Sequence, residues 1–418
     1  MPTATAVDAT PLRRLRITTG LVVAVAAVRI LAKGWVTTLY LEPTHHLTYA
    51  GLGWVRPLPG PALHGLVAAL AIAGLVLASG RARRTSALLV AAGFAYLEAL
   101  DAALYLNHYW FVILLGLWLA ILPDGRTGGP AGPGTVPAWA LLAARFQVGV
   151  VYVFAGLAKL NPDWLAGRPL DLWLVDRREV WLIGPLLAAP WFAVAAAWLA
   201  AAFDLTIVGW LSWRPSRPWA YGALVVFHTV TGLLFPIGMF PLVMSASALV
   251  FFGARAMSAE APSPLAGVGG RRWVPVAVVA LVALELALPL RHLAIGSNVR
   301  WSDEGGSLAW RVMVSDKVGR LRFVARDPTT GEEWDVAPAL VLTDWQTAQA
   351  AIRPDLVHAT ALLVADELEP EHGRLEIRAD AWVSWNGRPP ARLVDPTIDL
   401  TTVERNRWAA PWVADAPA

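Results

Sequence analysis

The chain has no cysteine and little charge. With no cysteine among its 418 residues, it can form no disulfide, no thiolate nucleophile and no thiolate metal site. Charged residues make up 16% of the chain and hydrophobic residues 56%, whereas an ordinary soluble domain carries about 25% charged residues. The net charge is only +3, and no basic tract is dense enough for a nucleic-acid surface. These features exclude an ordinary soluble globule and a nucleic-acid partner.

Lysine is scarce as well. Lys33, Lys159 and Lys317 are the only lysines among 34 basic residues, which leaves 31 arginines. Together with the abundance of alanine, this bias indicates GC-rich coding and a bacterial origin. Because Lys159 lies in an apolar segment against this bias, it is a candidate for a specific chemical role.

Long apolar runs fill the chain up to Pro289. Nine segments are long or apolar enough to be membrane spans: residues 15–33, 62–79, 86–105, 109–122, 137–158, 190–211, 219–235, 237–253 and 273–290. A span needs ~20 residues, or fewer where helices break inside a bundle. A cytoplasmic N-terminus puts twelve arginines in inner loops and four in the opposite short loops, as the positive-inside rule favours. We predict a polytopic α-helical membrane bundle of about nine transmembrane helices in a bacterial plasma (inner) membrane.

The composition changes after Pro289. We predict a transmembrane domain over residues 1–290 and a small extracytoplasmic α+β domain rich in β-strands over residues 291–418. The elements expected in the second domain are strands at 308–316, 321–327 and 375–385, a helical stretch at 343–367 broken at Pro354, and turns at 327–331 and 386–387. Residues 254–270, rich in Gly, Ala, Ser and Pro, are predicted to be a flexible linker.

One apolar segment carries a polar stripe. Its members, at spacings of 4, 3, 4 and 3, are Arg145, Gly149, Tyr152, Gly156 and Lys159. These spacings put all five on one face of a helix. The polar side chains need partners inside the membrane, and the glycines let another helix or a flat ring approach the backbone. The stripe therefore predicts a buried reaction site rather than a lipid-facing surface.

Further ionisable residues lie within the predicted spans. Glu98, Asp101, Tyr105 and His108 follow at steps of 3, 4 and 3 and form a second predicted stripe, which ends at the same outer membrane depth as Lys159. Such residues are costly in a membrane and are expected to face an interior; the others are Arg29, Asp204, His228 and Glu285. Asp101 and Asp204 could neutralise Arg145 and Arg29. No His, Asp and Glu set has metal-ligand spacing, so no metal site is predicted.

Lys159 has two interpretations. A lysine at a helix end can extend its ammonium into the lipid headgroups. Alternatively, because it shares a stripe with Arg145 and Tyr152, it lies in an apolar pocket, where desolvation favours the free amine and makes it a competent general base. We favour the second interpretation. His108 and His228 can each be ordinary core histidines, and for His228 alone this is the preferred interpretation.

Six motifs resemble those of one known family, in the same order and over nearly the whole chain. They are Tyr152-Val-Phe-Ala-Gly-Leu-Ala-Lys-Leu-Asn-Pro-Asp-Trp164, Asp101 through Asn107-His108-Tyr109, Phe227-His228 with Phe235-Pro-Ile-Gly-Met-Phe240, Pro289-Leu-Arg-His292 with Trp301 and Trp310, Trp382-Val-Ser-Trp-Asn-Gly-Arg388, and Asp395-Pro-Thr-Ile-Asp399. They resemble segments of the vitamin K-dependent γ-glutamyl carboxylase family and its bacterial HTTM-domain homologues.

The resemblance implies an enzyme that uses reduced vitamin K or menaquinol. Oxygenation of this naphthohydroquinone to its 2,3-epoxide drives removal of a γ-proton from glutamate, and the resulting carbanion captures carbon dioxide. Dioxygen and carbon dioxide are then co-substrates. The implied catalytic residues are Lys159 as base, His292 assisting it, and Asn107 and His108 as hydrogen-bond donors to developing negative charge. The implied cofactor-binding residues are Tyr152, Arg145, His228, Trp301, Trp310 and Gly156.

The chain departs from the animal enzymes at several points. Ala158 replaces the first of a lysine pair, the bridging cysteines are absent, and the sequence stops near Pro417 where the animal enzymes continue. We therefore expect quinol epoxidation to be retained more readily than carboxylation of glutamate in an exported peptide. A non-catalytic quinone- or lipid-binding membrane module is the alternative, and it places the Lys159 ammonium in a salt bridge with an acid. A transporter ranks last, because no inverted repeat is visible.

Overall fold

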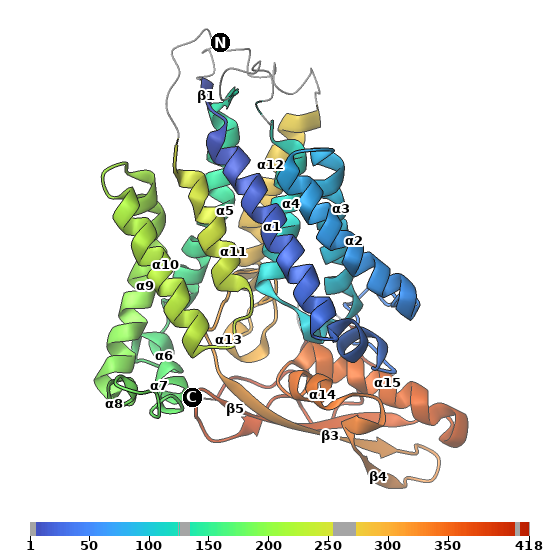
Figure 1. Cartoon of the computed structure of the whole chain (residues 1–418). Helices are drawn as coiled ribbons and strands as arrows, with labels where there is room; N and C mark the ends of the chain where they lie inside the picture. Colours follow the sequence, from blue (N-terminus) through green and yellow to red (C-terminus); the bar gives the residue numbers. More distant parts are fainter. Residues whose placement is uncertain (1–5, 124, 126–133, 254–272, 406–409, 418) are drawn as a thin grey trace.

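The computed structural model describes residues 6–123, 125, 134–253, 273–405 and 410–417. The chain is mostly helical, with long helices in a bundle and a small β-sheet at one end (Figure 1). The first described strand, β1 (Ala6–Asp8), lies at the opposite end of the bundle from this sheet. The predicted fold class, a helical bundle followed by a C-terminal part with strands, is confirmed at this level. The predicted linker 254–270 lies outside the described residues.

The bundle contains nine long or apolar helices within the described ranges. They are α1 (Thr10–Ala32), α2 (Gly60–Ser79), α3 (Arg83–Leu100), α4 (Asn107–Ile121), α5 (Ala138–Lys159), α9 (Pro190–Ser212), α10 (Arg217–Leu234), α11 (Phe240–Ser247) and α12 (Trp273–Leu290). Shorter elements join them: β1 (Ala6–Asp8) paired with β2 (Thr135–Pro137), η1 (Thr37–Leu41), η2 (Ala102–Leu104), α6 (Pro162–Leu165), α7 (Leu170–Val175), α8 (Gly184–Leu187), η3 (Ala248–Phe251), η5 (Arg291–Ala294) and α13 (Val299–Ser302).

Five of the described helices are long and apolar enough to cross a membrane. These are α1, α2, α5, α9 and α12, the last counted together with η5. The helix α4 and the segment Phe240–Phe251 are apolar but shorter. Each of the nine predicted spans overlaps a helix, but only about five of the described helices are long and apolar enough to be spans. These five helices make the protein a membrane protein.

The predicted third span is wrong at its outer end. The helix α3 stops at Leu100, and Asp101 is extended, with φ −150° and ψ 117°. Since helical spacing ends there, Glu98, Asp101, Tyr105 and His108 do not form one helical stripe. The break is stabilised by tertiary hydrogen bonds, because the Ala102 amide donates to the Leu47 carbonyl (2.7 Å) and Asp101 accepts from the Ala103 amide.

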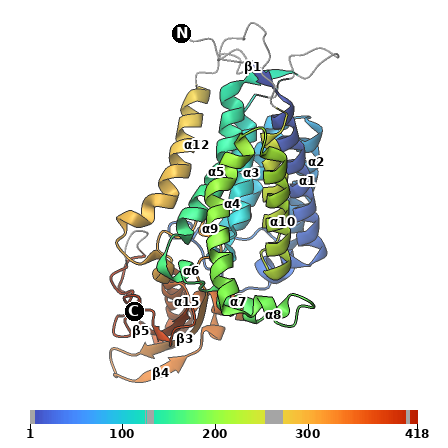
Figure 2. The same ribbon diagram turned by 90° about the vertical axis from the view of Figure 1, so that its left-hand side faces the viewer.

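The stripe on α5 faces α9. A Cβ added at Gly156 would come within 2.8 Å of the Leu205 side chain, and one at Gly149 would come within 3.2 Å of Val208. These glycines therefore allow α9 to pack closely against α5 (Figure 2), as the first of the two expectations for Gly156 states.

Substitution of Gly156 by valine is expected to destabilise the bundle by about 1–3 kcal/mol, because the added atoms overlap Leu205 and its backbone amide. Thermal unfolding in detergent or nanodiscs measures the change. The matched control is Gly222→Ala on α10, where an added Cβ meets nothing within 4 Å. Equal melting temperatures for Gly156→Val and wild type would contradict the close packing.

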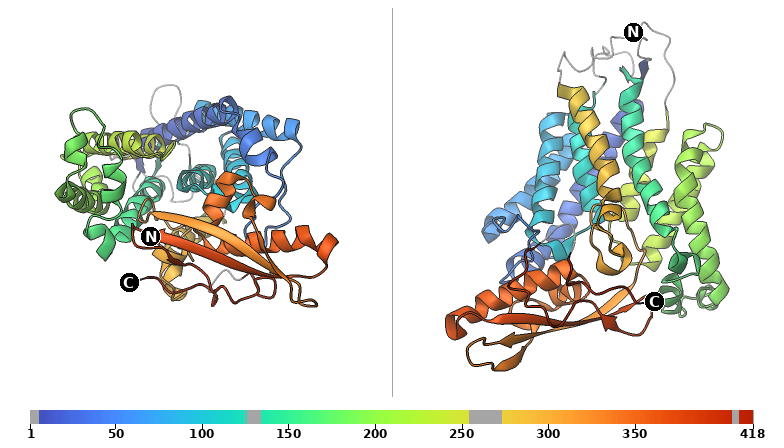
Figure 3. Two further views of the ribbon diagram at one scale, coloured as in Figure 1. Left: turned by 90° about the horizontal axis from the view of Figure 1, so that it is seen from below. Right: turned by 180° about the vertical axis from the view of Figure 1, so that it is seen from behind.

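The C-terminal sheet has four antiparallel strands in the order β4–β3–β5–β6. They are β3 (Lys317–Arg326), β4 (Glu333–Val336), β5 (Glu376–Trp385) and β6 (Ala391–Arg392), with Phe323 opposite Ala379 in the central pair. Two helices, α14 (Asp344–Ala350) and α15 (Pro354–His372), lie between the sheet and the bundle (Figures 1 and 3). Side chains of β5 alternate between this buried layer and the outer face, as strand geometry requires.

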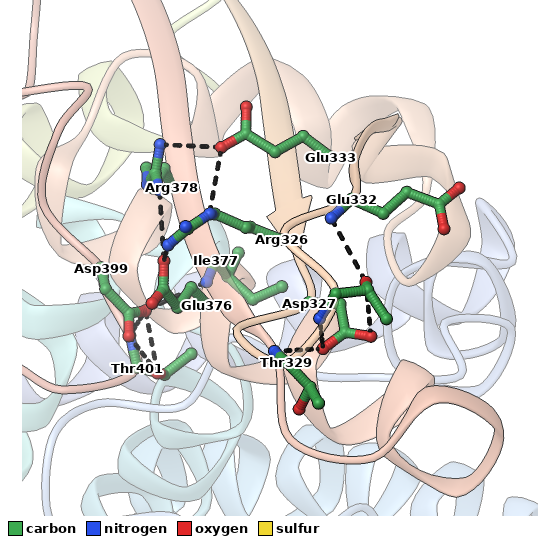
Figure 4. Close-up of polar contacts among 11 residues, drawn as sticks. Arg326, Asp327, Thr329, Glu332, Glu333, Glu376, Ile377, Arg378, Asp399 and Thr401 are labelled. Atoms are coloured by element: carbon green, nitrogen blue, oxygen red, sulfur yellow. Dashed lines mark hydrogen bonds and ion pairs between the residues drawn. The ribbon is translucent and has the colours of Figure 1, made fainter.

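The outer face of the sheet carries ladders of ion pairs (Figure 4). Arg326 contacts Glu376 at 2.9 Å and Glu333 at 3.5 Å, and Arg378 bridges the same two carboxylates. The pairs are partly exposed, so they contribute little to stability. They do mark this face as the one turned to water.

Most of the predicted C-terminal elements are confirmed, and one is wrong. The strand at 375–385, the turn after Asp327 and the helix break at Pro354 are present. Residues 308–316 are not a strand, because Leu308, Trp310 and Met313 have φ between 52° and 58°, which an extended strand does not allow. The alternation there arises from packing, since Trp310 enters the bundle core.

Candidate active site

A cavity of about 770 Å³ opens beside α5, α9 and α10 (Figure 2 shows the three helices). Its wall is mainly apolar and includes the stacked rings of Phe203 and Phe227, with centroids 4.2 Å apart. Only four of the described residues that line it carry titratable side chains: Tyr152, Lys159, Asp204 and His228. The cavity is therefore a largely apolar chamber with two polar spots.

The mouth of the cavity lies on the apolar outside of the bundle. Leu199 on α9 and Val226 and Leu233 on α10 line the cavity and are 71%, 63% and 79% exposed. Leu199 belongs to α9, one of the described helices long and apolar enough to cross a membrane. A lipid-soluble molecule can thus reach the cavity from within the bilayer.

Lys159 and Asp204 form the first polar spot. The Lys159 Nζ donates to Asp204 Oδ2 at 2.7 Å and lies 5.2 Å from the centre of the Trp164 ring. Lys159 is only 6% exposed, which excludes a side chain extended into the headgroups. Lys159 lines the apolar cavity as the favoured interpretation expects, and it also has the acid partner that the alternative of a binding module expects. Asp204 therefore neutralises Lys159, not Arg29 or Arg145.

Tyr152 and His228 form the second polar spot. The Tyr152 hydroxyl and His228 Nε2 lie 2.7 Å apart, and both residues are buried. The His228 Nδ1 is buried and makes no hydrogen bond with the described residues. Tyr152 precedes Lys159 by two helical turns on the same face of α5, so the two polar spots are about 10 Å apart along the cavity.

Three predicted catalytic residues do not line the cavity. His108 is buried behind its wall, where its ring lies against Gly238, next to the lining residue Ile237. Asn107 accepts a hydrogen bond from the Tyr105 hydroxyl at 3.1 Å. His292 Nδ1 lies 2.8 Å from the Pro289 carbonyl in the connection that follows α12. Their catalytic roles remain predictions.

Four predicted cofactor-binding residues also lie away from the cavity lining. Trp301 packs in the core of the C-terminal domain and donates to the Ala414 carbonyl, while Trp310 is fully buried against Phe111 of the bundle. Arg145 donates to the Phe251 carbonyl near the other end of α5, about 21 Å from Lys159 along the helix. Gly156, as shown above, contacts α9.

The loop that follows Lys159 holds the C-terminal domain. Asp163 accepts two hydrogen bonds from Arg388, at 2.7 and 3.1 Å, and one from Asn386 at 2.8 Å. Asn161 accepts from Arg300 at 2.8 Å. Two of the motifs quoted from the sequence, one in each half of the chain, therefore bind each other.

The charge of Asp163 is stabilised by this contact. Burial alone would raise the pKa of Asp163, but the hydrogen bonds from Arg388 and Asn386 and the positive charges of Arg388 and Arg300 outweigh it. The pKa of this carboxyl is consequently lowered from its usual value.

A second contact joins the bundle to the C-terminal domain. Gln346 of α14 donates a hydrogen bond to the Asp101 carboxylate at 2.8 Å.

Sequence reasoning missed the partnership of Lys159 with Asp204 and the role of Asp163. The spacing of Gly149 and Gly156 was the available signal for the first, since it marks the face of α5 on which another helix packs. No local signal pairs Asp163 with Arg388, which is 225 residues away. Within the described residues, no three His, Cys, Asp or Glu side chains gather as a metal site.

Two family models together match almost the whole chain. The HTTM domain matches residues 5–255, and the lumenal domain of vitamin K-dependent gamma-carboxylase matches residues 270–418. No solved structure gives a significant match. The apolar helices, the buried polar residues and the first match define a membrane protein of the HTTM class. With both matches in this order, the chain belongs to the vitamin K-dependent γ-carboxylase family.

Proposed function

We propose that this protein is an integral membrane oxygenase that converts a reduced naphthoquinone, vitamin K hydroquinone or menaquinol, to its 2,3-epoxide. The observation that carries the proposal is the Lys159–Asp204 pair in the wall of a cavity open to the bilayer. We place the N-terminus in the cytoplasm of a bacterium and the C-terminal domain outside its plasma membrane. The family match supports a vitamin K-dependent carboxylase-like protein.

The cavity suits such a molecule in size and surface. Ligand sites of about 300–1,000 Å³ with apolar walls and few polar groups are typical for small molecules, and this cavity measures about 770 Å³. Phe203, Phe227 and Phe235 offer faces and edges to a flat bicyclic ring. When bound, the reduced quinone supplies the electrons that dioxygen accepts.

The residues of the chain supply a base and a dry surrounding. Lys159 Nζ lies 2.7 Å from Asp204 Oδ2, so transfer of a proton from Lys159 to Asp204 would leave a free amine on Lys159. The amine then takes the proton of a hydroxyl group placed within about 3 Å of Nζ. The apolar lining excludes water, which strengthens these interactions and prevents side reactions. Tyr152 and His228 can hydrogen-bond a second oxygen of the same molecule.

Carboxylation of a glutamate in an exported peptide is the second part of the proposal. The lumenal-domain match at residues 270–418 supports it, because that domain belongs to a carboxylase. Carbon dioxide is then the co-substrate, and the peptide approaches from the side of the C-terminal domain.

A specific observation also favours a non-catalytic quinone- or lipid-binding module. Such a module needs the Lys159 ammonium in a salt bridge with an acid, and Asp204 provides that acid. Quinone binding without epoxide formation distinguishes the binding module from the oxygenase.

The test uses the purified full chain in nanodiscs with vitamin K hydroquinone, dioxygen, bicarbonate and a glutamyl peptide. Mass spectrometry after one turnover is expected to find the epoxide, and a mass gain of carbon dioxide on the peptide if carboxylation is coupled. Epoxide with unmodified peptide establishes the oxygenase alone. Quinone bound in stoichiometric amount with no epoxide establishes the binding module and overturns the oxygenase.

A further inference from the structure

The connection between α7 and α9 contains an exposed apolar tip just before α8. The tip consists of four consecutive residues, Val180, Trp181, Leu182 and Ile183, which are 38%, 83%, 75% and 44% exposed. A contiguous apolar surface of this kind is rare on a face turned to water and marks an interaction surface. The ion-pair ladders on the outer face of the sheet show the contrasting composition of a surface that water covers.

Two backbone hydrogen bonds close this tip into a tight turn. The Val180 amide donates to the Arg177 carbonyl at 3.0 Å, and the Gly184 amide donates to the Val180 carbonyl at 2.7 Å. Only glycine fits at position 184, because a Cβ there would overlap the Arg178 carbonyl. Among the described residues, the amides of Trp181, Leu182 and Ile183 make no backbone hydrogen bond. The tip therefore suits the headgroup level, where water and lipid oxygens accept from these amides, and not the centre of the hydrocarbon layer.

The tip lies where the membrane surface should be. The helices α7 and α8 cross the end of α9 just before its span begins at Pro190, and seen from below they lie beside the sheet (Figures 2 and 3). Trp191 is 64% exposed at the start of α9, and tryptophan is enriched at membrane interfaces. Arg177 is exposed beside the tip and can pair with a lipid phosphate, whereas the exposed Arg178 lies 3.4 Å from the Glu179 carboxylate.

The same segment also forms part of the cavity wall. Val180 and Ile183 of the tip, with Leu186 and Leu187 of α8, line the cavity from the side facing α9 and α10. One edge of the segment therefore faces the cavity while Trp181 and Leu182 point away from the protein.

We propose that residues 176–189 form an interfacial anchor, with the apolar tip inserted among the lipids of the leaflet nearest the C-terminal domain. The anchor also forms one rim of the portal through which a lipid-soluble substrate enters the cavity. This second part rests on the proposed function, whereas the insertion of the tip does not. The partner is the bilayer surface itself, with acyl chains around Trp181 and Leu182 and a phosphate group at Arg177.

The chain has no cysteine, so a cysteine introduced by substitution is the only site that a thiol-reactive label modifies. The depth of that site in the membrane can therefore be measured directly. A nitroxide at Trp181→Cys is compared with one at Val279→Cys on α12 and one at Val318→Cys on β3, sites that are 67% and 68% exposed. Vesicles of phosphatidylethanolamine and phosphatidylglycerol hold the protein. The ratio of collisions with oxygen to collisions with a water-soluble nickel chelate is expected to be several-fold higher at position 181 than at 318, approaching that at 279. A ratio equal to that at 318 would overturn the anchor.

The portal is tested by the rate of quinone entry. Ile183→Trp narrows the cavity rim, and Ile183→Val is its control. Menaquinone added in vesicles is expected to quench tryptophan fluorescence several-fold more slowly in Ile183→Trp, with the final level unchanged. Equal quenching rates in the two variants would contradict the portal and would leave the anchor proposal unaffected. Neither measurement needs turnover. A protein that forms no epoxide would therefore contradict the proposed oxygenase, while the measured depth of position 181 would still test the anchor.

Discussion

Replacing Lys159 with alanine is expected to lower the initial rate of epoxide formation by about 10²–10⁴-fold, the usual contribution of a positioned general base. The reason is local, since Lys159 is the only lysine in the cavity wall and the three other titratable groups there are engaged with it or with each other. Chromatography of the quinone products over the first minutes of reaction measures the rate. Lys33→Ala, at the exposed end of α1, is the matched control and should keep the wild-type rate.

Folding must be separated from chemistry in this experiment. Lys159→Ala leaves Asp204 buried without a partner, which costs about 3–5 kcal/mol in comparable pairs. The double variant Lys159→Gln with Asp204→Asn keeps a neutral, hydrogen-bonding pair of similar size. We expect it to melt near the wild-type temperature and still to form almost no epoxide. A double variant that is folded and makes epoxide at the wild-type rate would reject Lys159 as the base.

Loss of the Arg388 side chain is expected to weaken the attachment of the C-terminal domain to the bundle by about 2–5 kcal/mol, because it leaves the Asp163 carboxylate largely buried and without its main partner. Hydrogen exchange at residues 161–164 and 384–388 measures this loss. Arg326→Ala is the matched control, since its ion pairs lie on the exposed sheet face and should contribute no more than about 1 kcal/mol. Unchanged protection in Arg388→Ala would contradict the docking role of Asp163.

The same contact is expected to depend on pH in a defined direction. The pKa of Asp163 is lowered in the folded protein, so the carboxylate contributes stability at every pH above its usual value of about 3.9. That contribution is lost as the pH falls through the lower folded-state value. Protection at residues 384–388 should therefore hold from pH 7 to about pH 4 and fall below it. Arg388→Ala should show a much smaller fall over the same range.

The sequence predicted the helical bundle, the C-terminal sheet and the face of α5 that carries the site. This was possible because helical periodicity and strand alternation are local properties, and Tyr152, Gly156 and Lys159 do share the face that meets α9 and the cavity. The pairing of Lys159 with Asp204 could not be predicted, since it depends on which helix packs against α5. Several acids in the predicted spans were equally eligible by sequence.

The two wrong elements have a common cause. The apolar and polar spacing runs through Asp101 as if the helix continued. A break there is stabilised by the hydrogen bond from the Ala102 amide to the Leu47 carbonyl and by the one from Gln346 to Asp101. Residues 308–316 alternate like a strand, but Trp310 is drawn into the bundle core and turns the backbone to positive φ. In both cases contacts between distant parts of the chain outweigh the local pattern.

Only three residues separate Lys159, which touches Asp204 inside the bundle, from Asp163, which grips the outer domain. The next residue, Trp164, places its ring 5.2 Å from Lys159 Nζ. So short a connection allows little independent movement of the two side chains. A shift of the C-terminal domain that moves Asp163 is consequently expected to move Lys159 as well, so the position of one domain constrains the site in the other.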